Sequence, residues 1–227
     1  MSKKTILYTF IVVCVLYFFS ALLQLDSLEI LTKPLFLPVL LYYYIKKCKG
    51  NYQYRVIISF IFYYIAEMLV LNDGKQYYLI SVSFFLVPYL ILLYFVIKDL
   101  FPLLKDKGYN KINVSVFIVF VLLVYLYVSI ISILDTETFY EEALLNFYGL
   151  ILMLLGVFAI TLYILKHSAI NLFLIMTVIA FIVSDMFYIF IVKIEYNWVF
   201  KSVNLISQLL SYYFFVTYSL INAKNRK

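Results

Sequence analysis

The sequence predicts an all-α membrane protein, a polytopic bundle of eight transmembrane helices that forms one domain over residues 1–227. Hydrophobic residues occupy 66% of the positions, a fraction that a soluble domain of this size cannot bury because its surface is too large relative to its core. The apolar runs are continuous over about 17 to 25 residues, the length that a helix needs to cross a bilayer. Only five Gly and four Pro interrupt the chain, and helices satisfy every backbone group within lipid.

Eight apolar runs follow one another, and each is separated from the next by a short break that carries charge. The first follows Lys3-Lys4 and resembles a signal peptide, but it is too long and no Ala-x-Ala site follows it, so we expect an uncleaved helix. The longest break, from Lys98 to Lys111, contains Pro102 and Gly108, and we expect a loop along the membrane surface. The expected helices are 5–24, 28–45, 54–71, 76–97, 112–134, 142–165, 168–192 and 200–222.

The basic residues are distributed unevenly between the two sides of this bundle. With the N-terminus in the cytoplasm, 14 of the 18 Lys and Arg residues fall on the inner side, and only Lys33, Lys75, Lys193 and Lys201 fall on the outer side. Because cationic loops stay on the cytoplasmic side, we expect both termini to face inward in a multi-pass protein of the cell membrane. The net charge of +6 is then a topology signal, and no nucleic-acid partner is expected.

Two carboxylates, Glu67 and Asp185, lie inside the apolar segments, whereas the other ten acidic residues are assigned to the short polar breaks between those segments. A carboxylate in hydrocarbon costs several kcal/mol unless it is neutral, paired or turned toward a wet cavity. At 1.5 Å of rise per residue, Glu67 lies roughly 6 Å and Asp185 roughly 10 Å from the outer end of its helix. Lys33, at the outer mouth of its helix, and Asn204 and Gln208 fall at similar depth. The sequence therefore predicts one polar cavity near the outer face.

Neighbouring polar residues extend this predicted cavity. Tyr63 precedes Glu67 by four residues and so shares its helical face, and Ser184 adjoins Asp185. Structural alternatives remain open: the acids could be hydrogen-bonded to tyrosines, and Lys33 could extend to the interface. The side-chain amides of Asn204 and Gln208 could form hydrogen bonds between helices. Most Tyr and Phe residues are expected to face lipid or the interfaces, and no metal cluster is apparent in the sequence.

Several short motifs occur here in one order along the chain. Lys33-Pro34-Leu35 begins the second helix, and Glu67 follows Ala66 in the third. Pro88 follows Phe84-Phe85 in the fourth helix, Phe181-Ile182-Val183-Ser184-Asp185 lies in the seventh, and Gln208 precedes Tyr212 in the last. In these motifs, and over most of its length, the chain resembles the YhhN family of lysoplasmalogenase-like membrane proteins. That family carries Gly-Asp where this chain has Ala66-Glu67, and a histidine where it has Pro88.

The resemblance implies a cofactor-free hydrolase that cleaves the vinyl ether bond of lysoplasmalogens to a fatty aldehyde and a glycerophospho-base. Glu67 and Asp185 would be the catalytic pair, because protonation of a vinyl ether gives an oxocarbenium ion, as in glycoside cleavage by two carboxyl groups. Which of the two is the acid stays open. Lys33 would contact the phosphate of the lysophospholipid, and Tyr63, Ser184, Asn204 and Gln208 would complete the substrate site.

Two other functions remain open at this stage. Pro88 in place of the family histidine favours a lipid-binding or regulatory membrane protein that keeps the fold without the chemistry. Buried acids also relay protons in carriers. The sequence offers little support for a carrier, because it has no Gly- or Pro-interrupted helices at corresponding positions in two halves.

Overall fold

A computed structural model of the chain describes residues 3–72, 75–107, 114–134, 136, 138–193 and 196–225, without the side chains of residues 75, 106, 107, 115, 193 and 225. Over these residues the fold is all-helical and contains eight α-helices and no strand. The helices are α1 (Lys3–Leu22), α2 (Asp26–Cys48), α3 (Tyr54–Val70), α4 (Lys75–Lys107), α5 (Val114–Ile133), α6 (Phe139–Leu165), α7 (Ala169–Lys193) and α8 (Trp198–Asn225).

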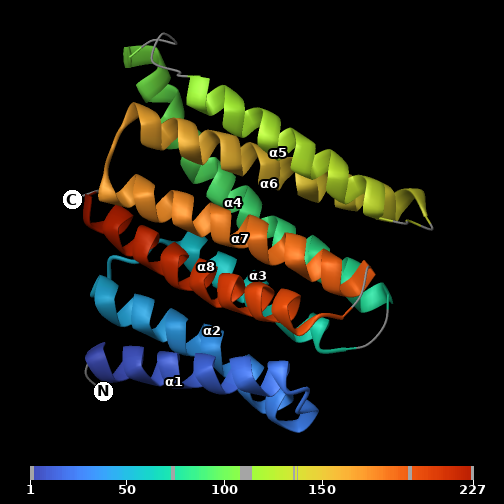
Figure 1. Cartoon of the computed structure of the whole chain (residues 1–227). Coiled ribbons are helices and arrows are strands. Elements are labelled where there is room, and N and C mark those ends of the chain that lie inside the picture. The colour runs from blue at the N-terminus through green and yellow to red at the C-terminus, as the bar shows by residue number, and fades with distance from the viewer. Residues whose placement is uncertain are drawn as a thin grey trace.

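The helices run side by side in an elongated bundle (Figure 1). The pair α1–α2 forms one side, α5 lies at the opposite side, and both ends of the chain lie at the same end of the bundle. Between these sides, α7 packs on α8, α3 on α4, and α4 on α6. The first two of these pairs are neighbours in sequence, whereas α4 and α6 are not, and the site lies among these helices.

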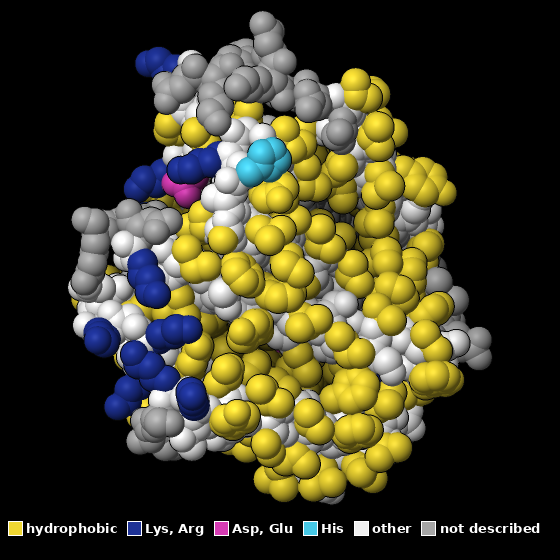
Figure 2. All heavy atoms as spheres, turned by 60° about the vertical axis from the view of Figure 1, so that its left-hand side comes forward, with side chains coloured by type: hydrophobic (Ala, Val, Ile, Leu, Met, Phe, Trp, Pro, Cys, Tyr) yellow, Lys and Arg dark blue, Asp and Glu magenta, His cyan; other side chains and the backbone are white. Residues whose placement is uncertain are grey.

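Six of the described helices, α1, α2 and α4 to α7, are long and apolar enough to cross a membrane. Figure 2 shows hydrophobic side chains over most of one face and Lys and Arg side chains gathered along one margin. The fold is that of a multi-pass membrane protein. The two remaining helices are less typical, since α3 has 17 residues, near the lower limit for a crossing, and α8 carries a polar stripe that includes Asn204 and Gln208.

The predicted end of the fourth helix was wrong. Residues 98–107 continue α4 as helix rather than forming a surface loop, because Leu100 is buried and Leu103 and Leu104 pack against the core, which keeps an apolar face in contact beyond Pro102. Gly108 and Lys111 lie outside the described residues. At the start of α6, the hydroxyl of Thr138 accepts a hydrogen bond from the backbone N–H of Glu141 at 3.2 Å.

The cap formed by Thr138 marks the start of α6 and so places Glu141 inside the helix. Because α6 begins at Phe139, Glu141 lies within its first turn, where it is 2% exposed. Glu141, which was expected in a polar break, is therefore a buried acid within α6.

A group of aromatic side chains fills the centre of the bundle, whereas others, such as Tyr8, Tyr125 and Phe139, are exposed on its surface. The largest fully buried side chains are tyrosines and phenylalanines, among them Tyr17, Tyr44, Tyr63, Tyr89, Tyr212 and Tyr218. Large flat rings bury much apolar area and pack edge-to-face between helices. A buried tyrosine also carries a hydroxyl that can donate a hydrogen bond inside the bundle, and both Glu67 and Asp185 accept such bonds.

Candidate functional site: two carboxylates on one cavity

Glu67 lies in the last turns of α3, where its side chain is fully buried and has partners from two other helices. Gln208 Nε2 donates a hydrogen bond to Glu67 Oε1 at 2.7 Å, and the Tyr212 hydroxyl donates to the same oxygen at 2.5 Å. Gln208 and Tyr212 are four residues apart on α8, so one helical face presents both donors. The ammonium of Lys33, from α2, lies 3.4 Å from Glu67 Oε2. A buried cation thus compensates the charge of this carboxylate.

Asp185, in α7, is held by two tyrosine hydroxyls. Tyr89 of α4 donates to Asp185 Oδ2 at 3.0 Å, and Tyr148 of α6 donates to the same oxygen at 2.7 Å. The two tyrosine rings lie 5.4 Å apart between their centroids and pack against each other. Both hydroxyls converge on Oδ2, which leaves Oδ1 without either of these donors. The environment of Asp185 is therefore polar, and among the described side chains no cation pairs with it as Lys33 does with Glu67.

Both carboxylates line a single cavity of about 70 Å³, so the prediction of a shared cavity is confirmed. Its wall is built by α3, α4, α6, α7 and α8, and it also includes Ser81, Phe85, Tyr188, Asn204 and Gln208. At one water-sized volume of roughly 10–15 Å³ each, the space holds a few waters. It does not hold a whole lipid, so a lipid substrate would place only its reacting bond here.

Three of the predicted substrate-site residues line this cavity. Asn204 Nδ2 donates to the backbone oxygen of Ser184 at 2.8 Å and to its hydroxyl at 3.2 Å, which joins α8 to α7 beside Asp185. Among the described residues, the amide oxygen of Gln208 is buried without a hydrogen-bond partner. Since Gln208 gives its N–H to Glu67, its free oxygen can accept a hydrogen bond from a molecule inside the cavity.

Tyr63 does not fit its predicted place. Its side chain is fully buried and is absent from the cavity wall, because it packs within a group of rings that includes Phe181, 5.5 Å away, and Tyr212, 5.0 Å away between centroids. The Tyr63 hydroxyl is buried with no hydrogen-bond partner in the part of the chain that is described. Tyr63 therefore supports the wall from behind.

Lys33 also differs from its prediction, which put it at an open outer mouth in contact with a lipid phosphate. The residue is 3% exposed, does not line the cavity, and is paired with Glu67. Lys201, at the start of α8, is half-buried and close enough to Glu29, Lys33 and Glu67 to interact electrostatically. The pairing explains why a lysine is buried at all, because a charged group in the interior requires a partner.

The sequence did not identify the two tyrosines that hold Asp185. The chain has 24 tyrosines, and spacing within α4 or α6 does not indicate which of them faces a residue of α7. The helix α6 contributes Leu145 and Tyr148 to the wall of the cavity, and no residue of that helix was predicted for the site. Only the packing of α6 against both α4 and α7 brings these residues to the acid.

The fold and the site together define a helical multi-pass membrane protein with two carboxylates on one interior cavity. Comparison with known proteins finds no matching family model, no matching curated protein and no matching solved structure.

Proposed function

We propose that this protein is an intramembrane hydrolase that cleaves the vinyl ether bond of a lysoplasmalogen-type lysophospholipid. The observation that supports this most strongly is that Glu67 and Asp185 line one cavity but have unlike partners. Acid–base catalysis by two carboxyl groups requires one that carries a proton and one that is ionised, and different environments are the usual means of separating them. The motifs shared with the YhhN family point to the same chemistry.

Asp185 is the proton donor in this proposal. It lies beside neutral hydroxyls rather than a cation, and burial without a compensating charge favours the protonated form of a carboxyl group. The oxygen not held by Tyr89 and Tyr148 would carry the proton. Glu67 is the ionised partner, because Lys33 balances its charge. A water held by the free oxygen of Gln208 is the nucleophile.

The reaction balances with water alone. The carboxylic acid protonates the carbon of the double bond distal to the ether oxygen, and the positive charge is then shared between the ether oxygen and the adjacent carbon. Water adds to that carbon and loses a proton to a carboxylate. The resulting hemiacetal collapses, and the carbon–oxygen bond breaks to give a fatty aldehyde and the glycerophospho-base.

The membrane arrangement follows the same proposal. All eight helices cross the bilayer with both termini in the cytoplasm, so the ends of α3 and α7 nearest the cavity face outward. The lipid phosphate lies at that face, where Lys201 replaces the buried Lys33 as its nearest cation. The reacting bond then lies one to two helical turns deeper than the headgroup, at the depth of the two acids.

The test uses purified protein in lipid nanodiscs and two lysolipids with the same headgroup and chain length. One carries a vinyl ether and the other an ester at the chain. We expect aldehyde release from the vinyl ether lipid and no fatty acid release from the ester, because ester cleavage needs a nucleophile and an oxyanion site rather than protonation at carbon. Release from the ester alone, or from neither lipid, contradicts the proposal.

A second function, lipid binding without hydrolysis, is favoured by one observation. Glu67 has three polar partners from two helices, as a purely structural carboxylate would have. Pro88 stands where the resembled family has histidine. Saturable binding of either lysolipid to nanodiscs without product from either would support this function and exclude the hydrolase.

A further inference from the structure

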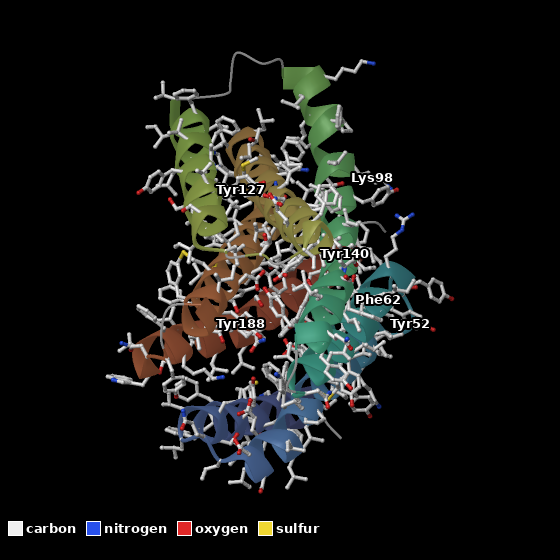
Figure 3. All side chains as sticks on the ribbon, turned by 90° about the vertical axis from the view of Figure 1, so that its right-hand side faces the viewer. Tyr52, Phe62, Lys98, Tyr127, Tyr140 and Tyr188 are labelled. Atoms are coloured by element: carbon white, nitrogen blue, oxygen red, sulfur yellow. The ribbon has the colours of Figure 1, made fainter. Side chains whose placement is uncertain are left out.

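A second cavity, of about 60 Å³, adjoins the site on the side of α5. It lies between α5, α6 and α7 and shares Leu145, Tyr148, Asp185 and Ile189 with the cavity of the two carboxylates. Asp185 and Tyr148 thus belong to both walls. Apart from these two and Tyr127, which lies between α5 and α6 (Figure 3), the second cavity is lined by aliphatic, methionine and glycine residues.

A third cavity continues the second toward the other end of the bundle. It has a volume of about 280 Å³ and shares Leu123, Leu126 and Ile182 with the second cavity. Every residue in its wall is aliphatic or glycine. Three adjoining cavities therefore lead from the polar site into a region lined only by hydrocarbon. We call the second and third cavities together the chain slot.

The length of the chain slot matches one leaflet of a bilayer. Along α7 the part of the slot that leads away from the carboxylate cavity extends from Asp185 to Ile175, ten residues, or about 15 Å. The hydrocarbon core of a bilayer is about 30 Å thick, so this is about the depth that one chain of one leaflet occupies.

Close packing of α5 on α6 keeps the slot narrow. A Cβ atom added to Gly156 would lie 2.6 Å from Leu123 Cδ1, and one added to Gly149 would lie 2.9 Å from the ring of Tyr127. These two glycines allow α5 to approach α6 closely at two levels. The space that remains between the helices suits one extended hydrocarbon chain better than two.

We propose that the chain slot binds the single hydrocarbon chain of a lysophospholipid, with the bond next to the headgroup placed at Asp185. This inference rests on the proposed function for the identity of the lipid and adds where its chain lies. A larger apolar groove of about 500 Å³ lies between α1 and α8, but it shares no residue with the wall of the carboxylate cavity. A chain in that groove would not connect to the site.

The direct test is photocrosslinking in nanodiscs with a single-chain lysophospholipid that carries a diazirine at the end of its chain. We expect labelled peptides from α5, α6 and α7 around Leu122, Ile160 and Ile179, and we expect unlabelled lysophospholipid of the same chain length to suppress this labelling. Labelling that is confined to the α1–α8 groove, or that competitor does not suppress, overturns the proposal.

Two variants and one matched control test whether filling the chain slot reduces the labelling. Leu126→Trp places an indole where the two parts of the slot meet, and Ile179→Trp fills the deeper part from a side chain that is 48% exposed and so has room to adjust. Val128→Trp adds the same group to an outward position of α5 that is 57% exposed and lines neither cavity. We expect at least a fivefold loss of competed labelling in both slot variants and none in the control.

The labelling experiment tests the chain slot, and the hydrolysis assay tests the proposed hydrolase, so a negative result in one can be told from a negative result in the other. Competed labelling of the slot in a protein that releases no aldehyde supports the chain slot and contradicts only the hydrolase. If the protein is active, Leu126→Trp should lower turnover of long-chain substrate more than turnover of short-chain substrate, and Val128→Trp should lower neither. Equal turnover of long chains by Leu126→Trp and wild type, with labelling unchanged, means that the chain lies elsewhere.

Discussion

The ammonium of Lys33 lies 3.4 Å from Glu67 Oε2, and both side chains are buried, at 4% and 0% exposure. The two residues come from α2 and α3, and Gln208 and Tyr212 of α8 complete the group. The ion pair and these two hydrogen bonds thus join α2, α3 and α8. Neither residue can change its charge without leaving the other uncompensated in a medium that solvates charge poorly.

Lys33→Met should therefore destabilise the protein rather than only weaken substrate binding. Removal of one partner of a buried pair costs about 3–5 kcal/mol, which should appear as a lower midpoint of thermal unfolding in detergent. The double variant Lys33→Met/Glu67→Gln removes both charges and should recover most of the loss. Lys49→Met, at an exposed position, is the control. A midpoint for Lys33→Met equal to that of the control would mean that the pair contributes nothing.

Asp185→Asn is the cleanest test of the acid–base chemistry. The amide keeps the size of the side chain and still accepts hydrogen bonds from Tyr89 and Tyr148, but it cannot donate a proton as an acid. Loss of a positioned proton donor should slow vinyl ether hydrolysis about 100-fold or more, while the thermal midpoint changes little. Hydrolysis by Asp185→Asn at the wild-type rate would show that this carboxyl group is structural.

Glu67→Gln requires a different design, because it leaves the buried ammonium of Lys33 unpaired. Activity should be compared between Lys33→Met and Lys33→Met/Glu67→Gln, after both proteins have been shown to be folded. If Glu67 is the ionised partner in catalysis, the double variant should be at least about 100-fold slower than the single one. Equal rates in the two would restrict Glu67 to a role in stability.

Tyr89→Phe and Tyr148→Phe test whether the hydroxyls position Asp185. Each variant removes one hydrogen bond of about 1 kcal/mol, which corresponds to about a fivefold fall in kcat, with KM unchanged because neither hydroxyl is expected to bind the lipid. Tyr125→Phe, at a position 74% exposed, should have no effect. A rise in KM with kcat unchanged would instead assign the tyrosines to substrate binding.

The topology can be tested independently of any activity. Because 14 of the 18 basic residues lie on one side of the predicted bundle, a reporter fused after Lys227 should be active only in the cytoplasm. Lys227 itself lies outside the described residues. Activity of that reporter on the outer side would reverse the orientation and place the carboxylate cavity near the cytoplasmic face.

The sequence by itself determined the helices, and it predicted a common depth for the two acids. Continuous apolar runs bounded by charge specify where a chain enters and leaves lipid, and a fixed rise per residue converts position into depth, so Glu67 and Asp185 could be assigned to one layer. Gln208 was found for the same reason. The end of α4 was missed because a proline and charged residues indicate a break, although the apolar face around Leu100 stays packed.

Only the tertiary structure decided which side chains face each other. A helical pattern gives the direction of a side chain relative to its own helix but not the identity of the neighbouring helix. Tyr89 and Tyr148 meet at Asp185 because α4 and α6 pack together and α6 also packs on α7. Lys33 lies inward for the same kind of reason: once Glu67 of the next helix is buried, the cost of an unpaired charge holds the ammonium beside it.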